Sequence, residues 1–231
     1  IQSLEQIMKI VADENLAFTD YFFAEFGDIQ HRAGRTLTAE DVKDAEALLI
    51  RSVTKVNAAL VQDSQIKFVG SATIGTDHLD IAALEQQNIR WSNAPGCNAQ
   101  AVAEYVITAL LHLQLQLINA NKEFTLGIVG LGNVGSRLAT MAKLLGWNVI
   151  AYDPFVQRDQ VHQVEFEELL KAADAISIHV PLTKTGQHPT YHLINANALG
   201  QMKPEAILIN SARGPVVEEA ALMQDIQHTQ R

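Results

Sequence analysis

A short stretch at residues 125–135, TLGIVGLGNVG, constrains the fold of this chain more than any other. It starts as an apolar run typical of a β-strand, turns on closely spaced glycines and continues into a helical pattern over residues 136–145. Gly130, Gly132 and Gly135 have the spacing G-x-G-x-x-G. Between a strand and a helix, this spacing is typical of a turn that binds the pyrophosphate of a dinucleotide.

Each glycine has a physical role in such a turn. Gly130 permits the tight turn, Gly132 lets a pyrophosphate approach bare backbone, and Gly135 removes a side chain where the helix packs against the strand. Asn133 and Val134 complete the turn, and its backbone N–H groups lie at the positive end of the helix dipole. The pattern alone also fits an ordinary strand-to-helix turn, so the surrounding sequence has to decide between the two interpretations.

A carboxylate at the expected distance favours the dinucleotide interpretation. The apolar run at residues 147–152 follows the helix and ends at Asp153, 18 residues after Gly135. This is where a dinucleotide-binding fold places an acid that binds the adenosine ribose hydroxyls. A carboxylate there repels the 2′-phosphate of NADP, so NAD is the predicted cofactor. Arg158 is the nearest cation that could reverse this preference.

The composition agrees with an α/β enzyme. Of the 231 residues, 48% are hydrophobic and 19% charged, enough for one large or two small cores. The net charge of −9 argues against a nucleic-acid partner, and no apolar run is long enough to suggest a membrane span. The one cysteine, Cys97, gives neither an internal disulfide nor metal-ligand spacing, which favours a cytoplasmic location.

Strands alternate with helices along the chain, which predicts parallel sheets with right-handed crossovers. Strands are expected at residues 9–12, 47–50, 66–70, 89–92, 125–129, 147–152, 175–179 and 206–209, and helices at 19–26, 39–44, 99–116, 136–145, 166–173 and 195–202. We therefore expect an α/β fold of two doubly wound parallel-sheet domains. The first, over residues 8–97, is flavodoxin-like; the second, over residues 98–231, is an incomplete Rossmann domain. Residues 1–7 are interpreted as an extension before Met8.

Ligands of such sheets bind beyond the carboxyl ends of the strands. Ser52 and Thr73 follow the strands at residues 47–50 and 66–70, and Arg213 follows the strand at 206–209. From the residues alone, the two hydroxyls also fit ordinary loop caps, and the arginine also fits a structural ion pair.

Four stretches resemble the D-2-hydroxyacid dehydrogenase family: residues 75–80 (GTDHLD), the glycine turn, residues 179–183 (HVPLT) and residues 209–214 (INSARG). Residues 50–57, 69–73 and 94–99 resemble a branch of the family that acts on a small phosphorylated 2-hydroxy acid. The resemblance runs from Met8 to about Asp225. It implies NAD-dependent oxidation of such an acid by a cytoplasmic homodimer.

The resemblance also assigns roles to single residues. Arg213 is implied as the catalytic arginine that holds the substrate carboxylate with two parallel hydrogen bonds. Ser52 and Thr73 are implied as substrate-binding residues, which makes residues 8–97 part of a substrate-binding domain. The implied NAD contacts are Gly130, Gly132, Asn133, Val134, Gly135, Asp153, Val180, Ser211, Ala212 and Arg213.

Two further residues that the family uses beside this arginine are not found. They are a histidine that takes the hydroxyl proton and a glutamate that orients it, both in segments after the arginine. Only 18 residues follow Arg213, and His228 matches neither segment. We therefore interpret the chain as a C-terminally truncated dehydrogenase that is inactive alone. An NAD(H)-binding interaction or sensor module, and a dehydrogenase of another D-2-hydroxy acid, are the alternatives.

The remaining histidines are interpreted as structural. His78 belongs to the start of a helix that a neighbouring aspartate caps, and His179 packs beside the cofactor site at the end of a strand. His188 and His192 are four residues apart, but Pro189 argues against a metal-binding helix. No metal is expected.

Overall fold

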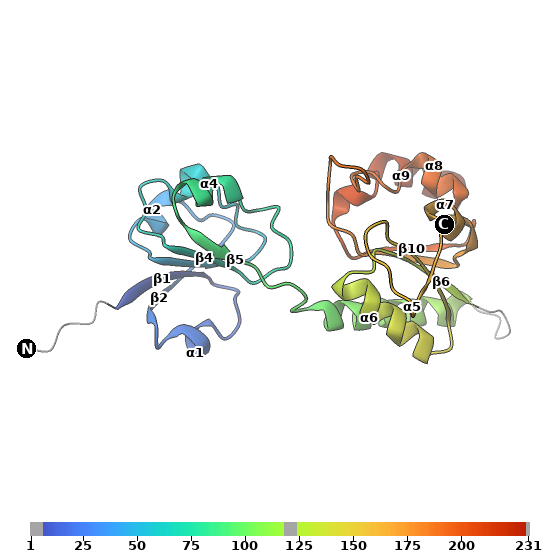
Figure 1. The fold of residues 1–231 in the computed structure, drawn as a ribbon, viewed down its shortest axis with the longest axis horizontal. Helices are drawn as coiled ribbons and strands as arrows, with labels where there is room; N and C mark the ends of the chain where they lie inside the picture. The colour runs from blue at the N-terminus through green and yellow to red at the C-terminus, as the bar shows by residue number, and fades with distance from the viewer. Residues whose placement is uncertain (1–6, 118–123, 230–231) are drawn as a thin grey trace, which may run out of the picture. The chain divides into compact units, whose positions relative to one another are not determined.

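The computed structural model describes residues 7–117 and 124–229. The chain divides into two compact units, Ile1–Cys97 and Asn98–Arg231. Each unit is a five-stranded parallel sheet with helices packed on it (Figure 1). The predicted α/β class with parallel sheets is thus confirmed.

The first unit has the strand order β2-β1-β3-β4-β5, which is the order of the flavodoxin-like fold expected for this unit. Its strands are β1 (Met8–Asp13), β2 (Gly27–Arg32), β3 (Ala47–Ile50), β4 (Phe68–Ser71) and β5 (Arg90–Ser92). Its helices are α1 (Thr19–Phe23), α2 (Ala39–Val42), α3 (Ala58–Val61) and α4 (Ile81–Gln86).

Alternate residues of the first sheet enter two separate cores, because successive side chains of a strand point to opposite faces. Val11, Leu48 and Ile50 pack with buried residues of α2, α3 and α4 in the larger core. On the other face, a small cluster contains Ile10, Ala12, Ala47 and Leu49. Figure 1 shows α1 on the opposite side of this sheet from α2 and α4.

The second unit has the strand order β10-β9-β6-β7-β8. Counted from β6 as the first strand of the unit, this is the Rossmann order over five strands. The strands are β6 (Thr125–Val129), β7 (Asn148–Tyr152), β8 (His162–Gln163), β9 (Ala175–Ile178) and β10 (Ile207–Asn210). The helices are α5 (Ala99–Leu117), α6 (Asn133–Leu144), α7 (Phe166–Ala172), α8 (Ala196–Gln201) and α9 (Glu219–Thr229), with a 3₁₀ turn at Gly214–Val216.

Helices cover both faces of the second sheet. Leu126 and Ile128 of β6 pack with buried residues of α5 and α6, such as Leu110 and Leu138. Val129 at the end of β6 lies in the opposite core, which includes residues of α7, α8 and α9. The strands β6, β7 and β9 are covered on both faces, so they are continuous apolar runs that the sequence reveals directly.

The structure corrects the sequence predictions at several places. β2 was not predicted, because this edge strand is mostly polar and exposed and is held by backbone pairing with β1. The short β8 was missed for a similar reason, since its two residues, His162 and Gln163, carry no apolar signal. The helix expected at residues 19–26 ends at Phe23.

Candidate functional site

The glycine turn links β6 to α6, and its backbone explains all three glycines. Gly130 has φ +97°, and a Cβ built on it would lie 2.8 Å from the carbonyl oxygen of His179. A Cβ on Gly135 would overlap the carbonyl oxygen of Gly130, whereas a Cβ on Gly132 meets nothing within 4 Å. Gly132 therefore borders open space at the N-terminus of a twelve-residue helix, which fits the close approach of a pyrophosphate.

Asp153 follows β7, and its carboxylate holds the glycine turn. Oδ2 accepts a hydrogen bond of 2.7 Å from the N–H of Leu131, which lies between the first two glycines of the turn. Oδ1 accepts from the N–H groups of Phe155 and Val156 at 2.9 and 3.0 Å. A carboxylate has about four acceptor positions, so these three bonds orient Asp153 and leave capacity for a ribose hydroxyl. The bond to Leu131 spans 22 residues and leaves no local pattern in the sequence.

The end of β9 lies against the same turn. The N–H of His179 donates to the carbonyl oxygen of Val129 at 2.8 Å and so continues the pairing of β9 with β6. Both ring nitrogens of His179 have a hydroxyl partner: Nε2 lies 2.8 Å from Ser177 Oγ, and Nδ1 lies 3.0 Å from Ser211 Oγ. Burial lowers the pKa of His179 from 6.5 to about 4, so its ring is neutral at pH 7.

The loop after β10 carries Ser211, Ala212 and Arg213, all of them half-buried. Asn210 braces this loop, because its Oδ1 accepts from the N–H of Ala212 at 3.1 Å and its Nδ2 donates to the carbonyl oxygen of Arg213 at 2.9 Å. Val180 follows β9, and its Cγ1 would lie 3.0 Å from a Cβ on Gly130. The second unit therefore brings the turn, Val180 and the loop of Arg213 to one edge, while their roles in binding NAD stay predictions.

The two predicted substrate-binding residues belong to the first unit. Ile50 of β3 is paired with Ser71 of β4, so Ser52 and Thr73 follow neighbouring strand ends. Ser52 is exposed and Thr73 is half-buried. The pairing thus brings the two segments to the same edge of the first sheet, where their role stays a prediction.

His78 is a buried partner of this edge, not part of a helix start. Its Nε2 lies 2.9 Å from Ser71 Oγ, which in turn lies 2.9 Å from the hydroxyl of Thr73. Helix α4 begins three residues after His78, and Asp80 caps it by accepting a 3.1 Å hydrogen bond from the N–H of Ala83. Ser71, Thr73 and His78 are close in the sequence, and the turn after β4 brings their side chains into contact.

Sequence reasoning missed a buried ion pair next to Ser52. Arg51 Nη2 lies 3.1 Å from Asp13 Oδ1. The side chain of Asp13 is fully buried, and that of Arg51 is 35% exposed. Asp13 ends β1 and Arg51 follows β3, its neighbour in the sheet. The sequence offered one signal for this ion pair: a carboxylate and an arginine that each stand at the end of an apolar strand.

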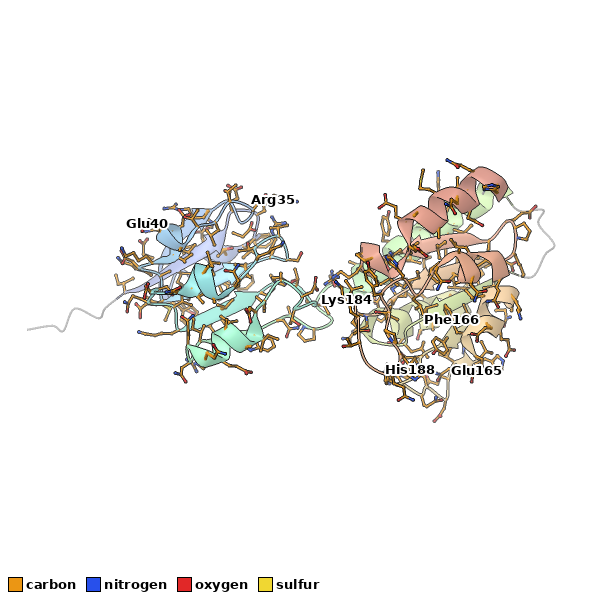
Figure 2. The ribbon with its side chains drawn as sticks, turned by 90° about the horizontal axis from the view of Figure 1, so that it is seen from above. Arg35, Glu40, Glu165, Phe166, Lys184 and His188 are labelled. Carbon is orange, nitrogen blue, oxygen red and sulfur yellow. The ribbon has the colours of Figure 1, made fainter. Side chains whose placement is uncertain are left out.

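The histidines with metal-like spacing make ring contacts instead. His188, labelled in Figure 2, meets the ring of Phe155 edge-on with centroids 5.4 Å apart, and His192 stacks on Tyr191 at 3.9 Å. Among the residues that the structure describes, no cluster of three or more His, Cys, Asp or Glu side chains could hold a metal ion. None of the helices in the described parts of the chain is long and apolar enough to cross a membrane.

Comparison with known families places the chain in a class. Residues 112–230 match the model of the NAD-binding domain of the D-isomer specific 2-hydroxyacid dehydrogenases. The chain belongs to this family, its second unit carries the family's NAD-binding domain, and the cofactor of that domain is NAD. The family and cofactor predictions are confirmed.

Individual relatives narrow the similarity. The erythronate-4-phosphate dehydrogenase of Acinetobacter baumannii is 70% identical over 224 residues, which are 97% of this chain and 63% of that protein. That of Cellvibrio japonicus is 49% identical over 216 residues, 94% of this chain and 56% of the relative. A solved structure of NAD⁺-bound 3-phosphoglycerate dehydrogenase from Entamoeba histolytica is 27% identical, with a TM-score of 0.81 over 96% of this chain and 77% of that one.

Proposed function

We propose that this chain serves the oxidation of 4-phospho-D-erythronate to 2-oxo-3-hydroxy-4-phosphobutanoate with NAD, a step in pyridoxal 5′-phosphate (vitamin B6) biosynthesis. The observation that carries the proposal is its 70% identity, over 97% of its length, with an erythronate-4-phosphate dehydrogenase. The polar residues that follow the strands, Ser52 and Thr73 in the first unit and Arg213 in the second, support the same class of reaction.

Five of the predicted site residues have distinct tasks in this reaction. NAD, when bound, supplies the acceptor for the hydride that leaves C2 of the substrate. Gly132 and the start of α6 receive the pyrophosphate, and Asp153 binds the ribose hydroxyls. Arg213 holds the substrate carboxylate at two points and so orients C2. Ser52 and Thr73 bind the hydroxylated, phosphorylated part of the substrate.

We further propose that the chain of 231 residues does not catalyse this oxidation by itself. Oxidation of the C2 hydroxyl needs a group that takes its proton, and such a group contributes about 10²- to 10⁴-fold to the rate. The histidine and glutamate that the family resemblance places after Arg213 are not among these residues. His228 is on α9, where its Nδ1 lies 2.6 Å from the carbonyl oxygen of Gln224 in the preceding helical turn.

The test compares the chain of 231 residues with the same chain joined to the C-terminal part of the Acinetobacter baumannii relative. NADH formation with 4-phospho-D-erythronate should appear only with the extended chain. Equal rates in both would contradict the proposed lack of activity and would require a proton acceptor within the given residues. An extended chain that oxidises only unphosphorylated 2-hydroxy acids would contradict the substrate, and one that binds NADH without turnover would favour the interaction or sensor module.

Substitutions in the extended chain separate the roles of the site residues. Arg213→Lys should lower kcat/KM about 10- to 100-fold, because an ammonium cannot reproduce the two-point hold on a carboxylate. Ser52→Ala and Thr73→Ala should raise KM for 4-phospho-D-erythronate and leave the affinity for NAD unchanged. A Lys variant with normal kinetics would show that Arg213 is structural.

We also propose that the enzyme is a cytoplasmic homodimer. The single cysteine, which is exposed, supports a reducing compartment, and the homodimer follows from the family resemblance. Light scattering on the extended chain tests the assembly, and a monomer at micromolar concentration would contradict it.

A further inference from the structure

His179 lies where the strand order of the second unit reverses. β6 has β7 on one side and β9 on the other, and ligands of doubly wound sheets bind beyond the carboxyl ends of the strands at such a point. His179 directly follows β9, and its N–H donates to Val129, the last residue of β6. Its carbonyl oxygen lies so close to Gly130 that a Cβ there would come within 2.8 Å. The backbone of His179 is therefore the surface against which the glycine turn rests.

The ring of His179 connects the ends of two strands. Nε2 lies 2.8 Å from the hydroxyl of Ser177, which is fully buried on the same strand, and Nδ1 lies 3.0 Å from the hydroxyl of Ser211 beyond β10. Ser211 Oγ also donates to the carbonyl oxygen of Ile178 at 3.3 Å. Because a hydroxyl has one proton, this pattern is satisfied when Nδ1–H donates to Ser211 and Ser177 donates to Nε2.

The charge state of the ring suits this arrangement. Burial lowers the pKa of His179 to about 4, so the ring keeps one donor and one acceptor at neutral pH. A neutral ring between two hydroxyls can hold both of them in one orientation.

Ser211 is the contact through which His179 reaches the loop of Arg213. Asn210, the last residue of β10, braces the loop through its bonds to the N–H of Ala212 and to the carbonyl oxygen of Arg213. These bonds are internal to the loop and fix its shape. The bond from His179 comes from another strand, so it fixes the position of the loop relative to β9 and the glycine turn.

We propose that His179 is a positioning residue: its ring holds the Ser211 hydroxyl and thereby keeps the loop of Arg213 in place beside the glycine turn for binding NAD and the substrate carboxylate. This inference rests on the proposed roles of Ser211 and Arg213. It adds a residue that acts on the site through Ser211.

The test uses two pairs of variants in the chain of 231 residues. His179→Asn keeps an amide group near the Nδ1 position that faces Ser211, whereas His179→Gln places its amide near the Nε2 position that faces Ser177. Ser211→Ala removes the proposed contact, and Ser177→Ala is the matched control that removes the other hydroxyl. Two quantities are measured for each: the Kd of NADH by fluorescence, and hydrogen exchange at the backbone amides of Ala212 and Arg213.

The loss of one hydrogen bond sets the expected size of the effects. His179→Gln and Ser211→Ala should each raise the Kd of NADH and the exchange rates of the loop about fivefold, while His179→Asn and Ser177→Ala stay within about twofold of the unchanged chain. The double variant His179→Gln with Ser211→Ala should be no worse than Ser211→Ala alone, since the serine variant already removes the contact with the ring.

Other results overturn the proposal. Equal effects of Ser177→Ala and Ser211→Ala, or equal effects of the Asn and Gln variants, would mean that the ring only fills space. Exchange at Ala212 and Arg213 reports on the loop without cofactor, so unchanged exchange overturns the inference by itself. A chain that fails to bind NADH before any substitution would count against the proposed function instead. If His179→Gln does not fold, the two serine variants still decide the question.

Discussion

In the first unit the strand order reverses between β1 and β3, and in the second unit it reverses between β6 and β9. The first reversal point is occupied by the ion pair between buried Asp13 and Arg51. The second is formed by Gly130 and the backbone of His179, with open space at the neighbouring Gly132. The same point of the sheet thus holds a charged pair in one unit and bare backbone in the other. Bare backbone suits the approach of a pyrophosphate.

The helices differ in a way that matches this contrast. Helices α1 to α4 of the first unit have four to six residues each, whereas α6 of the second unit has twelve and begins at the glycine turn. A longer helix aligns more peptide dipoles toward a phosphate at its N-terminus. Each unit also has one tryptophan, Trp91 in the first and Trp147 in the second. In a variant that keeps only one of the two tryptophans, fluorescence therefore reports on the unfolding of one unit.

The largest expected effect separates two glycines of the same turn. Gly135→Ala should destabilise the second unit by about 4 kcal/mol, because the new Cβ overlaps the backbone oxygen of Gly130. Gly132→Ala should leave the stability nearly unchanged, since its Cβ enters open space, yet weaken NADH binding about tenfold. Urea unfolding followed by Trp147 fluorescence and an NADH titration measure the two effects. Equal losses of stability would contradict the open geometry at Gly132.

A second prediction concerns the ion pair of the first unit. Arg51→Leu should destabilise that unit by about 3 kcal/mol, because it leaves the carboxylate of Asp13 buried without its cation. The double variant with Asp13→Asn should recover part of the loss, since no buried charge then remains. Unfolding followed by Trp91 fluorescence measures both variants, and Trp147 fluorescence is the control. If the double variant is as unstable as Arg51→Leu, the effect comes from packing of the arginine side chain.

A third prediction follows from the pKa of His179. Its value is about 4 in the folded protein and 6.5 ordinarily, so between these pH values the unfolded chain binds more protons. The contribution of His179 to the stability of the second unit is therefore present at neutral pH and is lost as the pH falls. Between about pH 7 and pH 5 the loss should be about 2 kcal/mol.

The control for this pH dependence is His179→Gln, which cannot take up a proton in this range. The difference in unfolding free energy between the unchanged chain and the variant should shrink on acidification. A difference that is constant from about pH 7 to pH 5 would contradict a neutral, buried ring.

The smallest expected effects come from one helix cap in each unit. Asn57 accepts a hydrogen bond from the N–H of Leu60, and Asn195 accepts from the N–H groups of Asn197 and Ala198. Asn57→Ala and Asn195→Ala should each cost about 1 kcal/mol, with the larger loss at Asn195 because two donors lose their partner. Each change should move the unfolding of its own unit only. A shift seen by both tryptophans would show that the two units unfold together.

Much of the fold could be predicted because it depends on local pattern. The strands at β3, β6, β7 and β9 are buried on both faces and therefore appear as continuous apolar runs. β2 could not be found in this way, since it is an exposed edge strand that exists through pairing with β1. The α1 segment was predicted too long for a related reason: Tyr21, Phe22 and Phe26 are exposed, so their spacing does not describe a buried helix face.

The sequence by itself determined the glycine turn, the acid after β7 and the family, because these depend on residues at short, constant spacing. Only the tertiary structure decided that Asp13 meets Arg51, that Asp153 holds Leu131 and that His179 holds Ser211. In each of these pairs a residue at one strand end or turn meets a residue far along the chain. Strand order brings such residues together, and strand order is set by the packing of whole strands and helices, which no short run of residues encodes.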